Sequence, residues 1–154
     1  MIKILFICLG NICRSPMAEF IMKDLVKKAG LEQEFMIDSR ATSTEETGNL
    51  IHHGTMGIFK KYQIPCTGHR AQQMSRQDYD TYDYLIGMDQ SNIRNMTRIA
   101  GGDPEKKIYK MMEFTGSGRD VADPWYTGDF EATYRDVSEG CQALLEKLKG
   151  NLAR

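Results

Sequence analysis

Short apolar runs alternate with helical patterns along this chain. Residues 3–8 are apolar after the first position, which is typical of a strand buried on both faces of a sheet. Runs at 35–37, 84–88 and 107–112 predict three further strands. Because alternating strands and helices form parallel sheets, we expect an α/β fold with helices on both faces of the sheet.

Helical patterns separate these strands. Ser15 and Pro16 predict a helix start, with Ser15 as the N-cap and Pro16 at the first helical position, and Gly30 marks the end of that helix. Further helices are predicted at about 49–62 and 91–99. The last helix has the clearest apolar stripe, which consists of Phe130, Tyr134, Val137, Cys141, Leu144 and Leu148.

Length and composition limit the classes of protein to consider. With 154 residues, of which 41% are hydrophobic, residues 1–154 are expected to form one domain with its own core. The formal net charge of −1 gives no reason to expect nucleic acid or a membrane surface as a partner. The apolar N-terminal run is too short for a signal peptide, and no run is long enough to span a bilayer. We therefore expect a cytoplasmic protein without membrane insertion.

The four cysteines, Cys8, Cys13, Cys66 and Cys141, are expected to be free thiols. In a reducing cytoplasm, catalysis or redox sensing is the usual reason for an exception. No Cys-x-x-Cys pair occurs, and the only adjacent histidines are His52 and His53. The sequence therefore predicts no metal site and no cofactor.

The stretch 8–16 contains the most informative chemistry. It joins the first predicted strand to the first predicted helix and reads Cys-Leu-Gly-Asn-Ile-Cys-Arg-Ser-Pro. Backbone N–H groups in such a loop, together with the positive end of the next helix, favour a bound anion. Arg14 adds a planar group that suits two oxygens of a tetrahedral oxyanion. We therefore predict a phosphate-binding loop after the first strand.

Cys8 lies at the end of this strand, where ligands of parallel α/β sheets usually bind. The helix terminus, the loop N–H groups and Arg14 favour its thiolate form, and the Ser15 hydroxyl could add a hydrogen bond to the sulfur. A thiolate is a competent nucleophile at phosphorus. The sequence predicts covalent catalysis by Cys8. The alternative is that Cys8 is a small buried residue and Arg14 a surface residue.

This loop resembles the signature loop of the low-molecular-weight protein tyrosine phosphatases. Further motifs occur in the order of that family, namely Ile37-Asp38-Ser39, Gly68-His69-Arg70-Ala71, Tyr82-Asp83-Tyr84, Met88-Asp89-Gln90-Ser91-Asn92 and Asp123-Pro124-Trp125-Tyr126. The resemblance covers essentially the whole chain. It implies a four-stranded parallel sheet flanked by helices. It also implies a single phosphatase domain over 1–154 that hydrolyses phosphotyrosine in proteins through a phosphocysteine intermediate.

The resemblance also implies roles for individual residues. Cys8 would be the nucleophile, Arg14 a phosphate ligand, and Asp123 the general acid that protonates the leaving tyrosine oxygen and then activates water. The other residues implied in phosphate or substrate binding are Leu9, Gly10, Asn11, Ile12, Cys13, Ser15, Trp125 and Tyr126. Two residues, Ser39 and His69, are implied as braces of the loop. A core position for Trp125 and an ordinary structural role for His69 are the alternatives.

In this family the cysteine equivalent to Cys13 forms a reversible disulfide with the nucleophile, which implies a redox role for Cys13. Packing is the alternative. Residues 40–48 contain no aromatic residue, unlike the same loop in eukaryotic members, and this predicts an open pocket rim and a bacterial-type member. Glu45 and Glu46 in this loop predict repulsion of acidic substrate flanks.

Three alternative functions stay open. An arsenate reductase of the same fold would need further cysteines near the third strand, and 82–89 contains none. A phosphoarginine phosphatase of the same family would carry threonine in place of Ile12. A non-catalytic phosphoprotein-binding module would not need Asp123. The partners that the resemblance implies are tyrosine-phosphorylated proteins, with a cognate tyrosine kinase among the candidates.

Overall fold

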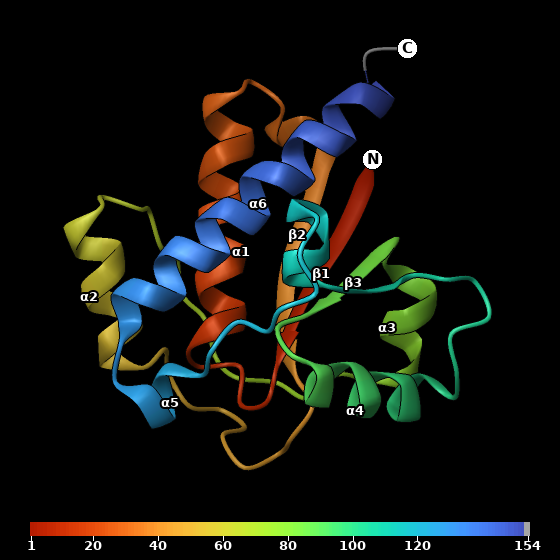
Figure 1. Cartoon of the computed structure of the whole chain (residues 1–154), viewed down its shortest axis with the longest axis horizontal. Helices are drawn as coiled ribbons and strands as arrows, with labels where there is room; N and C mark the ends of the chain where they lie inside the picture. Colours follow the sequence, from red (N-terminus) through yellow and green to blue (C-terminus); the bar gives the residue numbers. More distant parts are fainter. Residues whose placement is uncertain (153–154) are drawn as a thin grey trace.

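The computed structural model describes residues 1–152 and shows a four-stranded parallel sheet in the order β2-β1-β3-β4 (Figure 1). The strands are β1 (Ile2–Cys8), β2 (Phe35–Ala41), β3 (Tyr84–Gly87) and β4 (Ile108–Lys110). β1 pairs in parallel with both β2 and β3, so it is a central strand. The α/β fold with four parallel strands, as predicted, is confirmed.

Six helices of the described residues surround the sheet, together with two short 3-10 helices. They are α1 (Arg14–Lys28), α2 (His53–Lys61), α3 (Arg76–Thr81), α4 (Gln90–Ala100), α5 (Pro124–Thr127) and α6 (Phe130–Leu152), with η1 (Glu32–Glu34) and η2 (Met111–Thr115). Over 1–152 no helix combines the length and apolarity that crossing a membrane requires. The short helices α3 and α5 were not predicted from the sequence.

Neighbouring residues of β1 enter two separate hydrophobic clusters. Ile4 and Phe6 belong to the cluster that contains residues of α1, α2 and α6, whereas Leu5 and Ile7 belong to the cluster with residues of α3 and α4. All four side chains are fully buried. Successive side chains of a strand point to opposite faces of the sheet, so an unbroken apolar run fits a strand that is covered on both sides. Helices therefore cover both faces, as expected.

The N-terminal boundary of α1 differs from the prediction. The helix begins at Arg14, and Cys13 occupies the N-cap position without a side-chain capping bond. Ser15 is not the N-cap, because it already lies within the helix and its hydroxyl is 3.1 Å from the sulfur of Cys8. The active-site contact of Ser15 thus replaces the capping bond that the sequence suggested.

The predicted helix over 49–62 begins later, at His53. The N–H of Gly48 donates to the carbonyl of Ala71, and the N–H of Ala71 donates to the carbonyl of Asn49, which holds this segment outside the helix. His52 then caps α2 by accepting a hydrogen bond from the N–H of Gly54.

Strand β4 is shorter than predicted, because the chain continues into η2.

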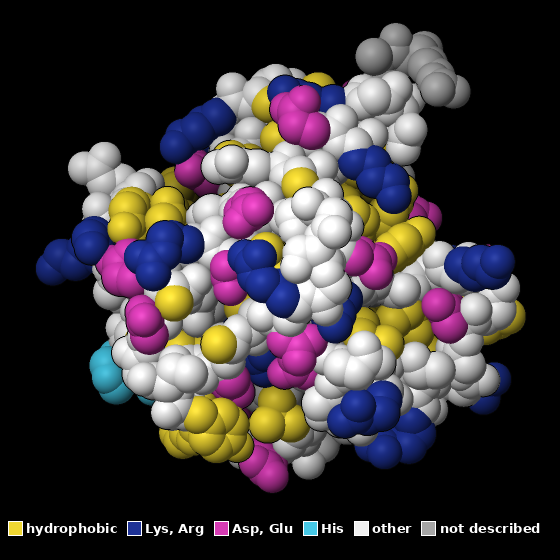
Figure 2. Space-filling view, in the orientation of Figure 1, with side chains coloured by type: hydrophobic (Ala, Val, Ile, Leu, Met, Phe, Trp, Pro, Cys, Tyr) yellow, Lys and Arg dark blue, Asp and Glu magenta, His cyan; other side chains and the backbone are white. Residues whose placement is uncertain are grey.

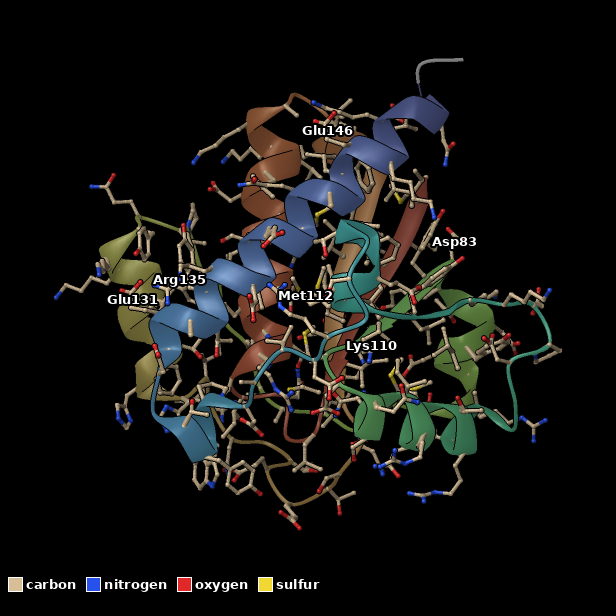
Figure 3. All side chains as sticks on the ribbon, viewed as in Figure 1. Asp83, Lys110, Met112, Glu131, Arg135 and Glu146 are labelled. Atoms are coloured by element: carbon tan, nitrogen blue, oxygen red, sulfur yellow. The ribbon has the colours of Figure 1, made fainter. Side chains whose placement is uncertain are left out.

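The contacts between α6 and α2 include an acidic residue of α6 and a glycine of α2. Glu131 of α6, labelled in Figure 3, accepts hydrogen bonds from Lys61 and from the hydroxyl of Tyr62 at the end of α2. Gly54 lies against the ring of Phe130, and a Cβ at this glycine would come within 2.4 Å of that ring. Position 54 therefore has no room for a side chain unless the ring of Phe130 moves.

Gly54→Ala is expected to lower the free energy of unfolding by about 1–3 kcal/mol, because the methyl group must displace the ring of Phe130. Gly57 in the same helix is the matched control, since a Cβ there would meet no atom within 4 Å. Gly57→Ala is expected to raise the free energy of unfolding by up to about 1 kcal/mol through helix propensity. Urea denaturation measures both changes, and equal stability of the two variants would contradict the close packing at Gly54.

Candidate active site

The carboxyl end of β1 opens into a pocket of about 110 Å³. Its wall is built from residues of the loop after β1, of the loop after β2, and of the segment around α5, which meet at the lower end of the molecule in Figure 1. Nine residues that the sequence analysis proposed line the pocket: Cys8, Leu9, Gly10, Ile12, Cys13, Arg14, Asp123, Trp125 and Tyr126. The other four, Asn11, Ser15, Ser39 and His69, do not line it.

Hydrogen-bond donors surround the sulfur of Cys8, which is only 3% exposed. The backbone N–H groups of Asn11 and Ser15 donate to this sulfur at 3.3 and 3.4 Å. The hydroxyl oxygen of Ser15 lies 3.1 Å from it. Donors directed at a buried sulfur stabilise negative charge on it, so this environment suits a thiolate nucleophile.

Asn11 connects the loop to neighbouring segments through hydrogen bonds. Its backbone φ of 59° is in the left-handed region, which asparagine tolerates better than most residues. Its side-chain Nδ2 donates to Ser15 Oγ at 2.8 Å and to Ser39 Oγ at 2.9 Å, and its Oδ1 accepts from the N–H of Gln72 at 3.2 Å. The Nε2 atom of His69 lies 3.0 Å from the carbonyl oxygen of Asn11. Ser39 and His69 thus both contact Asn11, as the suggested bracing role requires.

Glu19 of α1 extends this bracing, and the sequence analysis did not identify it. The residue is 3% exposed. Its Oε1 accepts from Ser39 Oγ at 2.6 Å, and its Oε2 accepts from Lys23 Nζ at 2.6 Å. The Nδ1 atom of His69 lies 3.7 Å from Oε1. Consecutive residues of a helix point about 100° apart, so Glu19 lies off the apolar stripe of the predicted helix that contains Ala18, and no sequence signal indicated its buried position.

Arg14 is almost fully buried beside the pocket and contacts two carboxylates. Its Nη1 donates to Asp89 Oδ2 at 2.7 Å and to the carbonyl of Val121 at 2.9 Å, and its Nη2 lies 3.4 Å from Asp123 Oδ2. Burial opposes the charged guanidinium, but the negative charges at Cys8 and Asp123 and the contact with Asp89 outweigh it and raise the pKa of Arg14. Arg14 is therefore a permanent cation at the pocket.

Asp89 is a second functional residue that was not assigned a role from the sequence. Its Oδ1 accepts from the N–H of Asn92 and caps α4, while its Oδ2 holds Arg14. The capping box that Asp89 forms with Asn92 is a local pattern that a sequence can reveal. The bond to Arg14 joins residues 75 positions apart, so no local pattern indicates it.

The segment around α5 places one carboxylate and two rings at the pocket. Asp123 caps α5, because its Oδ1 accepts from the N–H of Trp125 at 3.1 Å, and Pro124 follows at the start of the helix. Its other oxygen faces Arg14. Trp125 and Tyr126 are 56% and 77% exposed, which excludes a core position for Trp125. Figure 2 shows hydrophobic side chains gathered at this end of the molecule.

His52 connects the loop with α2 and α5, and it too was missed. Its backbone N–H donates to the carbonyl of Ile12 at 2.9 Å. Its Nδ1 accepts from the N–H of Gly54 at 3.0 Å, and its ring meets the ring of Trp125 edge-on at 5.6 Å between centroids. Burial and the neighbouring His53 lower the pKa of His52. A neutral ring fits the role of Nδ1 as an acceptor.

All four cysteines are free thiols, as predicted. Cys13 is 4% exposed, and burial, with added negative charge at Cys8 and Asp123, raises its pKa to about 12. Cys141 is fully buried on the apolar stripe of α6, which agrees with a packing role. Cys66 is partly buried and does not line the pocket.

The rim on the side of β2 is polar and acidic. Ser43, Glu45 and Glu46 line the pocket there. Repulsion of acidic substrate flanks by the two glutamates stays a prediction.

Comparison with known proteins places the whole chain in one group. The family described as low molecular weight phosphotyrosine protein phosphatase matches residues 3–154. The low molecular weight protein-tyrosine-phosphatase YfkJ of Bacillus subtilis is 41% identical over 97% of this chain and 97% of its own length. The crystal structure of YfkJ matches with a TM-score of 0.94 over 98% of this chain and 96% of that chain.

Two other crystal structures are similar. SP-PTP, a low molecular weight protein tyrosine phosphatase from Streptococcus pyogenes, is 48% identical, with a TM-score of 0.87 over 96% of this chain and 93% of that one. DARP, a Drosophila arginine phosphatase, is 30% identical, with a TM-score of 0.88 over 96% of this chain and 98% of that one.

Proposed function

Because the chain belongs to the low molecular weight phosphotyrosine protein phosphatase family and is a protein-tyrosine phosphatase, we propose that it hydrolyses phosphotyrosine in proteins through a phosphocysteine on Cys8. The observation that carries this proposal is the arrangement in one small pocket of Cys8, Arg14 and Asp123. A nucleophile, a fixed cation and a carboxylate are the three groups that this reaction needs.

In the first step the substrate phosphate lies between the loop and Arg14. Its oxygens take the place of Asp123 at Nη2, a contact that is long at 3.4 Å and is therefore readily exchanged. The Cys8 thiolate attacks phosphorus and forms an S–P bond while the P–O bond to tyrosine breaks. Asp123, in its protonated form, gives the leaving phenolate a proton, so that neutral tyrosine departs.

In the second step water breaks the S–P bond. Asp123, now ionised, accepts a proton from the attacking water, and phosphate and the Cys8 thiolate are released. The hydroxyl of Ser15 and the loop N–H groups stabilise the sulfur as it regains negative charge. Arg14 stays charged throughout and neutralises the phosphate oxygens.

The lining of the pocket favours a tyrosine side chain. Trp125 and Tyr126 offer exposed rings at its wall, and Ile12 adds an apolar side chain. The identity of 30% to an arginine phosphatase is lower than the 48% to a tyrosine phosphatase. An arsenate reductase relay has no further cysteine at the pocket beyond Cys13 within the described residues. A cognate kinase and a cytoplasmic location stay predictions.

Cys8→Ser is expected to lower turnover of a phosphotyrosine peptide by about 10⁴-fold or more, because the nucleophile is lost. Phosphate release measures turnover, and binding of vanadate reports whether the loop stays intact. Cys66→Ser is the matched control, because this thiol lies outside the pocket, and it should retain activity. Substantial turnover by the Cys8→Ser variant would exclude the covalent mechanism.

Asp123→Asn is expected to slow hydrolysis of phosphotyrosine by about 10²- to 10⁴-fold, because the phenolate then leaves without a proton. Asparagine can still cap α5, so the helix should persist. The loss should be much smaller for p-nitrophenyl phosphate, whose leaving group needs little protonation. An equal loss for both substrates would show that Asp123 is not the acid.

We further propose that Cys13 protects Cys8 during oxidation. Peroxide converts the Cys8 thiolate to a sulfenic acid, which is uncharged. Loss of the negative charge removes one of the influences that raise the pKa of Cys13 to about 12. The sulfur of Cys13 then attacks Cys8, an S–S bond forms, and water leaves.

After mild peroxide treatment, dithiothreitol should restore most activity of the wild type but little activity of Cys13→Ser, whose Cys8 proceeds to sulfinic acid. Mass spectrometry of the peptide that contains residues 8–14 identifies the products. Equal recovery of both proteins would remove the redox role of Cys13 and leave packing as its function.

A further inference from the structure

A second cavity lies outside the active site, and its lining residues come from α1, η1, β2 and the loop that contains residues 65–67. Its volume is about 290 Å³, compared with about 110 Å³ for the active-site pocket. This volume is close to the lower end of the roughly 300–1,000 Å³ that small-molecule sites occupy. Because β2 is an edge strand of the sheet, no further strand fills this side.

The lining of the cavity includes apolar side chains of the core. Phe20, Phe35 and Ile37 line it, and they are 2%, 7% and 8% exposed. The Nζ atom of Lys23 lies over the ring of Phe20, 4.8 Å from its centroid. Such a floor favours an aliphatic or aromatic group over a hydrated one.

The cavity also carries charges of both signs. Asp24 is paired with Lys28 at 2.8 Å, so this acid is already neutralised. Lys27 and Glu32 line the same cavity, and within residues 1–152 neither forms an ion pair within 4.0 Å. Lys27 and Glu32 are both exposed to solvent, so a cation and an anion without an ion-pair partner lie beside the apolar lining. This combination suits a zwitterion with an apolar side chain.

We propose that this cavity binds an apolar α-amino acid. The amino acid places its side chain on the floor, its carboxylate at Lys27 and its ammonium group at Glu32. The volume of the cavity suits a side chain of the size of leucine or phenylalanine.

Lys23 connects this cavity with the active-site loop. It lines the cavity, and its Nζ donates to the Oε2 of Glu19. The other oxygen of Glu19 accepts from Ser39, and Ser39 in turn accepts from the side chain of Asn11. The backbone N–H of Asn11 donates to the sulfur of Cys8. A continuous chain of hydrogen bonds therefore joins the cavity to the nucleophile.

A bound amino acid affects this series of hydrogen bonds through Lys23. Lys23 and Lys27 are one helical turn apart on α1, so a carboxylate held at Lys27 also attracts Lys23. When Lys23 turns to the ligand, the buried carboxylate of Glu19 loses its counter-charge, and its hold on Ser39 changes. Binding of the amino acid therefore lowers turnover without occupying the active site.

Amide chemical shifts of the vanadate-saturated enzyme test the binding. L-phenylalanine is the probe, and 3-phenylpropionate and phenethylamine each lack one of its two charges. L-phenylalanine should shift amides of α1 and β2 that line the cavity, and each control should bind about three- to fivefold more weakly. Shifts confined to 8–15, equal binding of 3-phenylpropionate, or no saturable binding at the solubility limit would each overturn the proposal.

Variants locate the site. Thr67→Trp, at an exposed residue of the lining, should fill the cavity and abolish the shifts. Lys27→Met should weaken binding about three- to fivefold, and it keeps the test valid if Thr67→Trp does not fold. Lys60→Met, at an exposed lysine of α2 outside the cavity, is the matched control and should bind as the wild type does. Unchanged binding by both cavity variants would overturn the proposal.

Turnover of p-nitrophenyl phosphate tests the coupling. Saturating L-phenylalanine should lower kcat of the wild type about fivefold or more. In Lys23→Met the amino acid should still bind, but kcat should not respond. An unchanged kcat in the wild type, an equal fall in Lys23→Met, or an increase in KM alone that more substrate overcomes would each overturn the coupling.

Discussion

The active site depends on the hydrogen bonds of one buried side chain, Asn11. The backbone of this residue is left-handed, and that conformation directs its N–H at the sulfur of Cys8. Its fully buried amide satisfies its donors at Ser15 and Ser39 and its acceptor at the N–H of Gln72. A buried polar group without a partner costs about 1–3 kcal/mol, so these partners hold the loop in the conformation that directs N–H groups at the sulfur of Cys8.

A buried cation imposes the second constraint. Arg14 is 2% exposed, and a guanidinium at this depth is stable only beside negative charge. Asp89 and Asp123 supply it, and each of them also caps a helix, α4 and α5 respectively. Two helix starts are thereby tied to the floor of the pocket. The same geometry places the proposed acid, Asp123, next to Arg14, the proposed phosphate ligand.

The sequence predicted interactions between residues that are close together in the chain and missed those between distant residues. The loop 8–15 is contiguous, so its chemistry could be recognised directly, and alternating apolar runs were enough for the parallel sheet. Glu19 and Asp89 act through partners 20 or more positions away, and no local pattern reveals such bonds. The predicted N-cap at Ser15 was wrong for a related reason, because the hydroxyl that would cap the helix is used at the sulfur of Cys8.

Two thiols, Cys8 and Cys13, line this pocket, and their surroundings differ in how well they stabilise negative charge on sulfur. Both Cys8 and Cys13 are buried, but donors are directed at the sulfur of Cys8. Burial is the largest cause that raises the pKa of Cys13 to about 12, and repulsion by negative charge at Cys8 and Asp123 adds to it. Cys13 is therefore neutral at pH 7. In physical terms, burial is the main reason that Cys13 stays protonated, so a loss of negative charge at Cys8 would remove only part of the barrier to its reaction.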